Sequence, residues 1–233
     1  MTPGYWFVIG VVVLALAAVL FAVWRDEELV TEGERGVWVV LAASDGTGQG
    51  LADPDDGAWP LLLARSLPPT SPRITNLSVA GLTLDRAIRE TLPKALRLEP
   101  LGVTIWLAVN DFGFGRPLPA YIADLETMLS TLQGIGAEVI VGNLPDLSTV
   151  PLLAEASGDA ARLRADCARW NAAIAEVAAK YGATVVDFFP DPIDPETLGP
   201  DGFHPSEEGQ RRLAERFRRA MPATEQAVPG LGR

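Results

Sequence analysis

The chain has 233 residues, of which 48% are hydrophobic, and a formal net charge of −11. This length allows one domain with a sizeable core, and the acidic chain lacks the basic stripe that nucleic-acid binding needs. The single cysteine, Cys167, excludes an intramolecular disulfide and a multi-cysteine metal site. The single histidine, His204, must carry any chemistry that needs an imidazole at neutral pH.

The first element expected along the chain is an uncharged apolar segment over residues 5–24. A helix of this length spans roughly 30 Å, the hydrocarbon thickness of a bilayer, and its terminal aromatic residues fit the interfacial belts. A cleaved signal peptide typically has basic residues before a shorter apolar run and a small-residue cleavage site after that run, and none of these features is present here. We therefore predict a single-pass membrane anchor and an acidic linker over residues 1–35.

The orientation of this anchor has two competing indications. Arg25 and Arg35 are the basic residues that flank the segment on its C-terminal side, and the positive-inside rule applied to them places that side in the cytoplasm. An N-terminal anchor, however, commonly carries an enzyme domain outside the cell membrane. We expect the second arrangement, with an extracytoplasmic domain.

From residue 36 onward, short β-branched apolar runs alternate with helical patterns. Strands are expected over residues 37–42, 73–79, 103–109, 138–141 and 184–188. Helices are expected over residues 59–64, 84–96, 118–132, 160–181 and 206–221. The alternation predicts an α/β domain over residues 36–222, with a doubly wound five-stranded parallel sheet and helices on both faces. Residues 223–233 are expected to form a flexible tail.

Ligands of such a sheet bind beyond the carboxyl ends of the strands, so the residues that follow each strand are informative. Ser44 follows the first expected strand, Gly81 the second and Asn110 the third. Asp201 and His204 follow the fifth strand and a loop rich in Pro and Asp. Each of these positions therefore carries a residue that acyl transfer could use.

These four segments, in this order, resemble the blocks of the SGNH/GDSL hydrolase superfamily, serine esterases on a flavodoxin-like sheet. The resemblance covers most of residues 37–221 and is most specific at Asp201-Gly202-Phe203-His204-Pro205. The first block, Ala42-Ala43-Ser44-Asp45, departs from the usual Gly-Asp-Ser and looks like a Gly-Ala-Ser-Asp variant with a further Gly-to-Ala change. The third block, usually Gly-x-Asn-Asp, begins here with Ala108. Both alanines add a methyl group where backbones normally approach closely.

The resemblance implies a role for each of the five residues. Ser44 would be the nucleophile, and His204 would remove its proton and return it to the leaving alcohol. Asp201 would accept a hydrogen bond from the other ring nitrogen and fix the tautomer. The Gly81 backbone N–H and the Asn110 side-chain amide would stabilise the oxyanion together with the Ser44 N–H, each donor being worth about 3 kcal/mol. No cofactor and no metal is implied.

The remaining polar residues have simpler interpretations. Two clusters of acidic residues have a spacing that matches no divalent-metal loop, and we take them as solvated loop acids. They are Asp53, Asp55 and Asp56, and Asp187, Asp191 and Asp194. Asp45 and Asp111 are expected to order loops rather than to react. The arginines of the last expected helix are taken as a solvated face. The loops at residues 111–119 and 143–152 are expected to shape the substrate pocket.

We therefore expect a membrane-anchored serine esterase that works through an acyl-enzyme on Ser44. Its substrate would be a small-molecule, lipid or O-acylated glycan ester. An acyltransferase that uses the same triad is an alternative. A catalytically inactive binding or scaffold domain is a second alternative, should the altered first block misplace Ser44.

Overall fold

The computed structural model of the protein describes residues 36–222. The expected anchor and linker over residues 1–35 and the expected tail over residues 223–233 lie outside the described residues. Among the helices of the described domain, none is both long and apolar enough to span a membrane.

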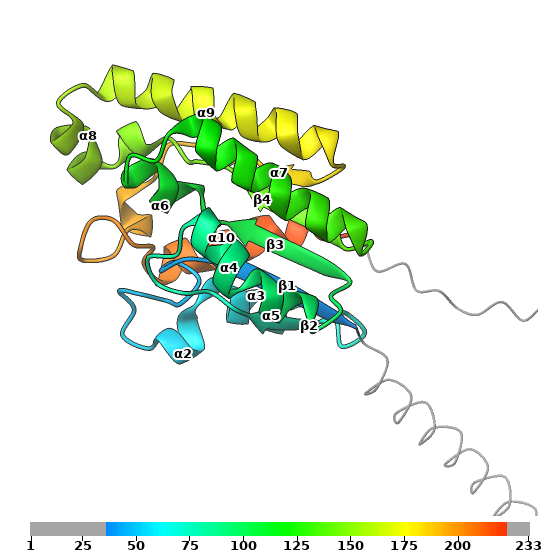
Figure 1. The fold of residues 1–233 in the computed structure, drawn as a ribbon. Coiled ribbons are helices and arrows are strands. Elements are labelled where there is room, and N and C mark those ends of the chain that lie inside the picture. The colour runs from blue at the N-terminus through cyan, green and yellow to red at the C-terminus, as the bar shows by residue number, and fades with distance from the viewer. Residues whose placement is uncertain (1–35, 223–233) are drawn as a thin grey trace, which may run out of the picture. The chain divides into compact units, whose positions relative to one another are not determined.

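The described residues form one parallel sheet of five strands in the order β2-β1-β3-β4-β5 (Figure 1). The strands are β1 (Val37–Ala42), β2 (Arg73–Asn76), β3 (Gly102–Trp106), β4 (Glu138–Gly142) and β5 (Thr184–Val186). In the centre of the sheet, Val39 of β1 lies opposite Thr75 of β2 and Val103 of β3. This is the flavodoxin-like strand order, and it confirms the predicted doubly wound sheet.

Helices cover both faces of the sheet (Figure 1). Their bounds are α2 (Pro54–Gly57), α3 (Trp59–Ser66), α4 (Leu84–Glu90), α5 (Leu92–Leu96), α6 (Ala108–Gly113), α7 (Leu118–Gly134), α8 (Pro151–Ser157), α9 (Ala160–Lys180) and α10 (Glu207–Ala220), with 3-10 turns η1 (Leu147–Thr149) and η2 (Pro195–Thr197). Helices α4, α5, α7 and α9 share one hydrophobic core with the sheet, and α3 and α10 share the other.

The two cores draw on alternate residues of each strand, because successive side chains of a strand point to opposite faces. Val39 and Leu41 of β1 belong to the core under α7 and α9, whereas Trp38 and Val40 belong to the core under α3 and α10. All four are buried. A strand buried on both faces reads as a continuous apolar run, which is why the sequence shows β1 so clearly.

Two predicted helix and strand boundaries in the middle of the chain are wrong. The single helix expected over residues 84–96 is two helices, α4 and α5, that meet at Thr91. Pro93 lies in the first turn of α5 and has no N–H to continue the ladder from α4. The third strand ends at Trp106 rather than at residue 109, and the chain turns into α6, so Asn110 lies on a helix.

The second and fifth strands are also shorter than expected. Past the end of β2, the backbone N–H groups of Leu77 and Val79 still donate to β1, so hydrogen bonding between the two segments continues beyond the strand. Past the end of β5, the backbone N–H of Phe188 donates to the Asn143 side chain at 2.8 Å instead of to a neighbouring strand. The short helices α2 and α8 were not expected from the sequence.

The start of α10 is tied closely to the turn η2. Ser206 is the N-cap of α10, and its hydroxyl accepts from the Gly209 N–H at 3.3 Å. A Cβ at Gly209 would lie only 2.3 Å from the carbonyl oxygen of Thr197 in η2. Because η2 and α10 flank the loop with Asp201 and His204, this close approach helps to place that loop.

We predict that Gly209→Ala lowers the free energy of unfolding by about 1–3 kcal/mol, because the added methyl forces two backbones apart. Denaturant unfolding measures this change. Gly134→Ala in α7 is the matched control, since a Cβ there would meet no atom within 4 Å, and it should keep or slightly raise the stability. An unchanged unfolding midpoint in Gly209→Ala would contradict the prediction.

Candidate active site

Ser44 lies in the turn that follows β1, at the carboxyl edge of the sheet. Strand β1 has β2 on one side and β3 on the other, and such a switch in strand order is where open α/β sheets bind ligands. The Thr47 hydroxyl and the Gln49 N–H both donate to the Ser44 carbonyl oxygen, at 2.9 and 3.0 Å. These bonds fix the turn, and Ser44 is left only 8% exposed.

The fold brings together the three residues predicted to form a triad. Nε2 of His204 lies 3.0 Å from Oγ of Ser44, although the two residues are 160 positions apart. Nδ1 of His204 lies 2.5 Å from Oδ2 of Asp201. The backbone N–H groups of Phe203 and His204 donate to Oδ1 of Asp201, at 3.0 and 2.9 Å. The carboxylate therefore holds both the ring and the loop that carries it.

The carboxyl group of Asp201 stays ionised over the neutral pH range. Burial alone would raise its pKa, but hydrogen bonds from the His204 ring and from two backbone N–H groups outweigh this effect and lower the pKa to about 2. A carboxylate that remains charged next to an imidazole can stabilise the imidazolium form. The electrostatics of this pair thus suit proton transfer through His204.

Asp45, the residue after Ser44, anchors the turn to two helices. Its Oδ2 accepts from the indole Nε1 of Trp59 in α3 at 2.8 Å. Gln210 of α10 donates from Nε2 to the Asp45 carbonyl at 3.1 Å and accepts from the Trp59 N–H at 2.9 Å. Burial raises the pKa of the Asp45 carboxyl to about 6, against the lowering effect of the Trp59 hydrogen bond. The turn that presents Ser44 is thereby fixed from behind.

Of the three predicted oxyanion donors, Ser44 and Asn110 line the cavity and Gly81 does not. Among the described residues, the backbone N–H groups of Ser44 and Gly81 donate no hydrogen bond, so both remain free to bind a ligand. Gly81 has a φ of 70°, which favours glycine. Asn110 lines the same cavity as Ser44, and its Nδ2 donates to the Leu82 carbonyl at 2.9 Å. Gly81 is not part of the cavity wall.

A cavity of about 700 Å³ opens over Ser44, Asn110 and His204. Apolar side chains of its wall include Leu107, Val109, Leu147, Val150, Ile193 and Leu198, and charged side chains of residues 191–194 and of α10 also line it. Of the two loops expected to shape the pocket, residues 143–152 contribute and residues 111–119 do not. Phe112 instead packs edge-to-face on Trp170, with ring centroids 5.4 Å apart. The contribution of residues 188–198 was missed, because the sequence marks this segment mainly by its prolines and acids.

The acids near this cavity are engaged in ion pairs and hydrogen bonds. Asp191 and Asp194 pair with Arg216 and Arg212 of α10, at 2.6 and 3.4 Å. Asp187 accepts from the Asn143 amide at 2.7 Å. Within residues 36–222, no three His, Cys, Asp or Glu side chains gather into a cluster that could hold a metal ion.

Comparison with known proteins finds one matching family model and several solved structures with a similar fold. The model of the GDSL-like lipase/acylhydrolase family matches residues 42–212. The solved structure of TesA is 22% identical with a TM-score of 0.63, and the match covers 79% of this chain and 97% of TesA. The psychrotrophic esterase EstA from Pseudoalteromonas sp. is 18% identical with a TM-score of 0.64, over 79% of this chain and 96% of EstA.

A third solved structure extends the fold similarity to a carbohydrate esterase. Axe2, an acetylxylan esterase from Geobacillus stearothermophilus, is 16% identical with a TM-score of 0.62, over 79% of this chain and 93% of Axe2. At these identities the similarity to solved structures concerns the fold. No curated protein matches the chain.

Proposed function

Because this chain belongs to the GDSL-like lipase/acylhydrolase family and is an enzyme that acts on ester bonds, we propose that it hydrolyses carboxylic esters through an acyl-enzyme on Ser44. The observation that carries the proposal is the continuous contact from Asp201 through His204 to Ser44, with separations of 2.5 and 3.0 Å. This contact ends at Ser44 in the cavity wall, where we propose that an ester carbonyl reaches the Ser44 hydroxyl.

The proposed reaction has two proton-transfer steps at His204. As Oγ of Ser44 attacks the ester carbonyl, Nε2 of His204 takes the hydroxyl proton and later gives it to the leaving alcohol. Asp201 remains ionised and stabilises the imidazolium between these steps. Water then attacks the acyl-enzyme in the same way, which releases the acid and restores the Ser44 hydroxyl.

Three donors are assigned to the oxyanion that forms at the carbonyl: the N–H groups of Ser44 and Gly81 and the side-chain amide of Asn110. The two backbone donors have no partner within the described residues, which supports this assignment. Asn110 supports it by lying in the cavity wall beside Ser44. Donors placed in advance are most effective where negative charge develops in the transition state.

The shape of the cavity favours an ester with an apolar part larger than acetyl. Leu147, Val150 and Ile193 lie in the wall, and the volume of about 700 Å³ leaves room for several methylene groups. Each buried methylene contributes about 0.8 kcal/mol. We therefore propose that a butyryl ester is cleaved with a higher kcat/KM than the acetyl ester of the same alcohol.

We also propose that the uncharged segment over residues 5–24 anchors the protein in a membrane, with the catalytic domain on the extracytoplasmic side. The length of the segment and the aromatic residues at its ends support the anchor. The orientation rests on the common arrangement of N-terminally anchored enzymes.

The proposed triad is tested by combining substitutions. We predict that Ser44→Ala and His204→Ala each lower kcat for p-nitrophenyl butyrate by at least about a thousandfold, and that the double variant loses little more, because triad members act as one unit. A fluorophosphonate probe should label the wild type and not Ser44→Ala. Losses that multiply in the double variant, or an unlabelled but folded wild type, would contradict the proposal.

The role of Asp201 is tested by a substitution of the same size. Asp201→Asn should keep the melting temperature and lower kcat by about ten-thousandfold, since an amide favours the wrong tautomer and does not stabilise the imidazolium. Asp191→Asn is the matched comparison, because Asp191 also lines the cavity but pairs with Arg216 rather than with His204, and its kcat should fall far less than that of Asp201→Asn. Wild-type turnover in Asp201→Asn together with lost turnover in Asp191→Asn would assign the supporting carboxylate elsewhere.

The anchor is tested by fractionation of the full-length protein. We predict that it stays with membranes through a carbonate wash, and that a truncated protein beginning at Glu34 is soluble and keeps its ester turnover. Full-length protein in the soluble fraction, or a mature N-terminus that begins after Trp24, would show that the segment is not an anchor.

A further inference from the structure

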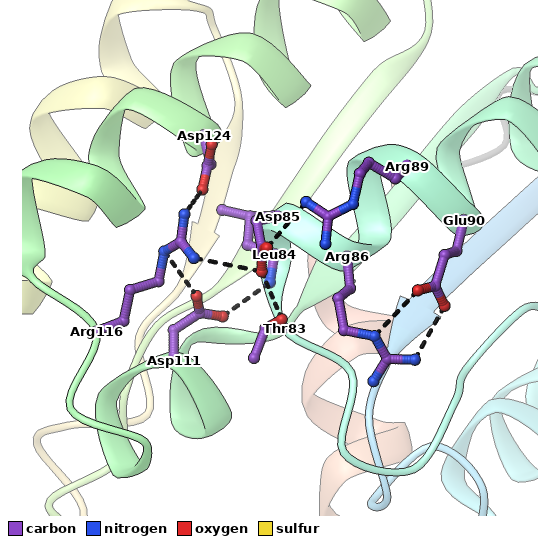
Figure 2. Close-up of polar contacts among 9 residues, drawn as sticks. All are labelled: Thr83, Leu84, Asp85, Arg86, Arg89, Glu90, Asp111, Arg116 and Asp124. Atoms are coloured by element: carbon purple, nitrogen blue, oxygen red, sulfur yellow. Dashed lines mark hydrogen bonds and ion pairs between the residues drawn. The ribbon is translucent and has the colours of Figure 1, made fainter.

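Two neighbouring residues of α6 hold the loop that follows Gly81. Nδ2 of Asn110 donates to the Leu82 carbonyl at 2.9 Å, and Oδ2 of Asp111 accepts from the Leu84 N–H at 2.8 Å. Figure 2 shows the second of these bonds, with the Asp111 carboxylate lying against the start of α4. The helix that carries one proposed oxyanion donor, Asn110, is therefore attached to the loop that carries another, Gly81.

Asp111 accepts from the first backbone N–H of α4, a helix whose N-cap side chain makes no capping bond. Thr83 is the N-cap of α4, but its hydroxyl makes no capping bond and donates instead to Oδ1 of Asp85 at 2.6 Å. The acceptor for the Leu84 N–H comes from Asp111, 27 positions away. A lost capping acceptor typically costs about 1 kcal/mol, so the start of α4 and the loop before it depend on this carboxylate.

Arg116 balances the charge of Asp111. Asp111 is fully buried, and its Oδ1 lies 3.4 Å from Nε of Arg116. Neither of these two atoms has a hydrogen-bond partner within the described residues. The same guanidinium contacts Asp124 of α7 and lies 3.4 Å from Asp85 of α4 (Figure 2). Arg116 thus ties α4, α6 and α7 together around one buried carboxylate.

The other side of the loop is held by Arg86. Its guanidinium donates to the Gly81 carbonyl at 3.3 Å and pairs with Glu90 one turn further along α4. The peptide that includes Gly81 is therefore bounded by contacts from α4 on one side and from α6 on the other. A loop held in this way keeps one orientation of its free N–H.

We propose that Asp111, held in place by Arg116, is a positioning residue that fixes the Gly81 N–H and the Asn110 amide relative to each other. The inference rests on the proposed function, because this placement matters only where these two donors bind an oxyanion. Asp111 touches neither Ser44 nor the cavity, so it acts through the donors alone. Burial raises the pKa of Asp111 to about 6, and the hydrogen bond from Leu84 and the charge of Arg116 counteract that rise.

The substitution Asp111→Asn distinguishes a positioning role of the Asp111 carboxylate from a role in packing alone. Both partners of the carboxylate, the Leu84 N–H and the Arg116 Nε–H, are donors, whereas an amide has one acceptor oxygen. Asp111→Asn therefore keeps the volume but turns one contact into a donor facing a donor. We expect kcat for p-nitrophenyl butyrate to fall about tenfold with KM within about twofold, because oxyanion donors act on the transition state.

Asp166→Asn is the matched control for this substitution. Asp166 also pairs with an arginine, Arg169 at 2.8 Å, but on α9 and away from the cavity. Its kcat and KM should match those of the wild type. Should Asp111→Asn fail to fold by circular dichroism, Arg116→Gln answers the same question by removing the balancing charge, with an expected loss of at least about threefold in kcat alone.

The double variant Asn110→Ala/Asp111→Asn tests whether Asp111 acts through the donors. Because residues of one network do not act independently, the combined loss in kcat should be smaller than the product of the two single losses by about threefold or more. A combined loss equal to that product, or a wild-type kcat in folded Asp111→Asn and Arg116→Gln, would overturn the inference. Absence of ester turnover in the wild type would instead overturn the proposed function, so the two failures are distinguishable.

Discussion

The contact between His204 and Ser44 is the constraint on which the rest of the structure depends. These residues come from opposite ends of the domain and must meet within 3.0 Å. The fold meets this requirement by packing α10, which follows His204, against α3, which follows the Ser44 turn. Trp59 of α3 stacks on Phe217 of α10 with ring centroids 4.5 Å apart, and the buried Gln210 bonds to both Trp59 and the Asp45 carbonyl. The hydrophobic core therefore positions the proposed chemistry directly.

The same local arrangement occurs twice at the carboxyl edge of the sheet. Ser44 is followed by Asp45 and Asn110 by Asp111, and each acid accepts a hydrogen bond from a neighbouring helix. Burial raises the pKa of each carboxyl to about 6. Such a group stays in place only where donors compensate for its desolvation. These acids fix the turns in front of them, which explains why acidic residues lie beside a site whose proposed reaction uses only Asp201.

The sequence predicts the strands and their tips well, and the contacts between distant segments poorly. Buried parallel strands show as apolar runs, and the three-residue spacing of Asp201 and His204 makes their contact local. By contrast, Val109 continues the apolar pattern of β3, yet it lies in α6 because the chain turns at Leu107. The bond from Leu84 to Asp111 and the wall formed by residues 188–198 arise from tertiary packing, which no short pattern in the sequence encodes.

The two unusual alanines of the sequence do not displace the proposed nucleophile, and the reason is steric. Ala42 is fully buried, and a Cβ at Gly46 would lie 2.8 Å from its methyl group and 2.3 Å from Oγ of Ser78. The absence of a side chain at residue 46 thus makes room for the methyl of Ala42. Ala108 is likewise fully buried, in the core under α7 and α9. Both methyl groups are accommodated in the packed interior, and Ser44 keeps its hydrogen-bond distance to His204. This geometry favours an active enzyme over an inactive scaffold domain.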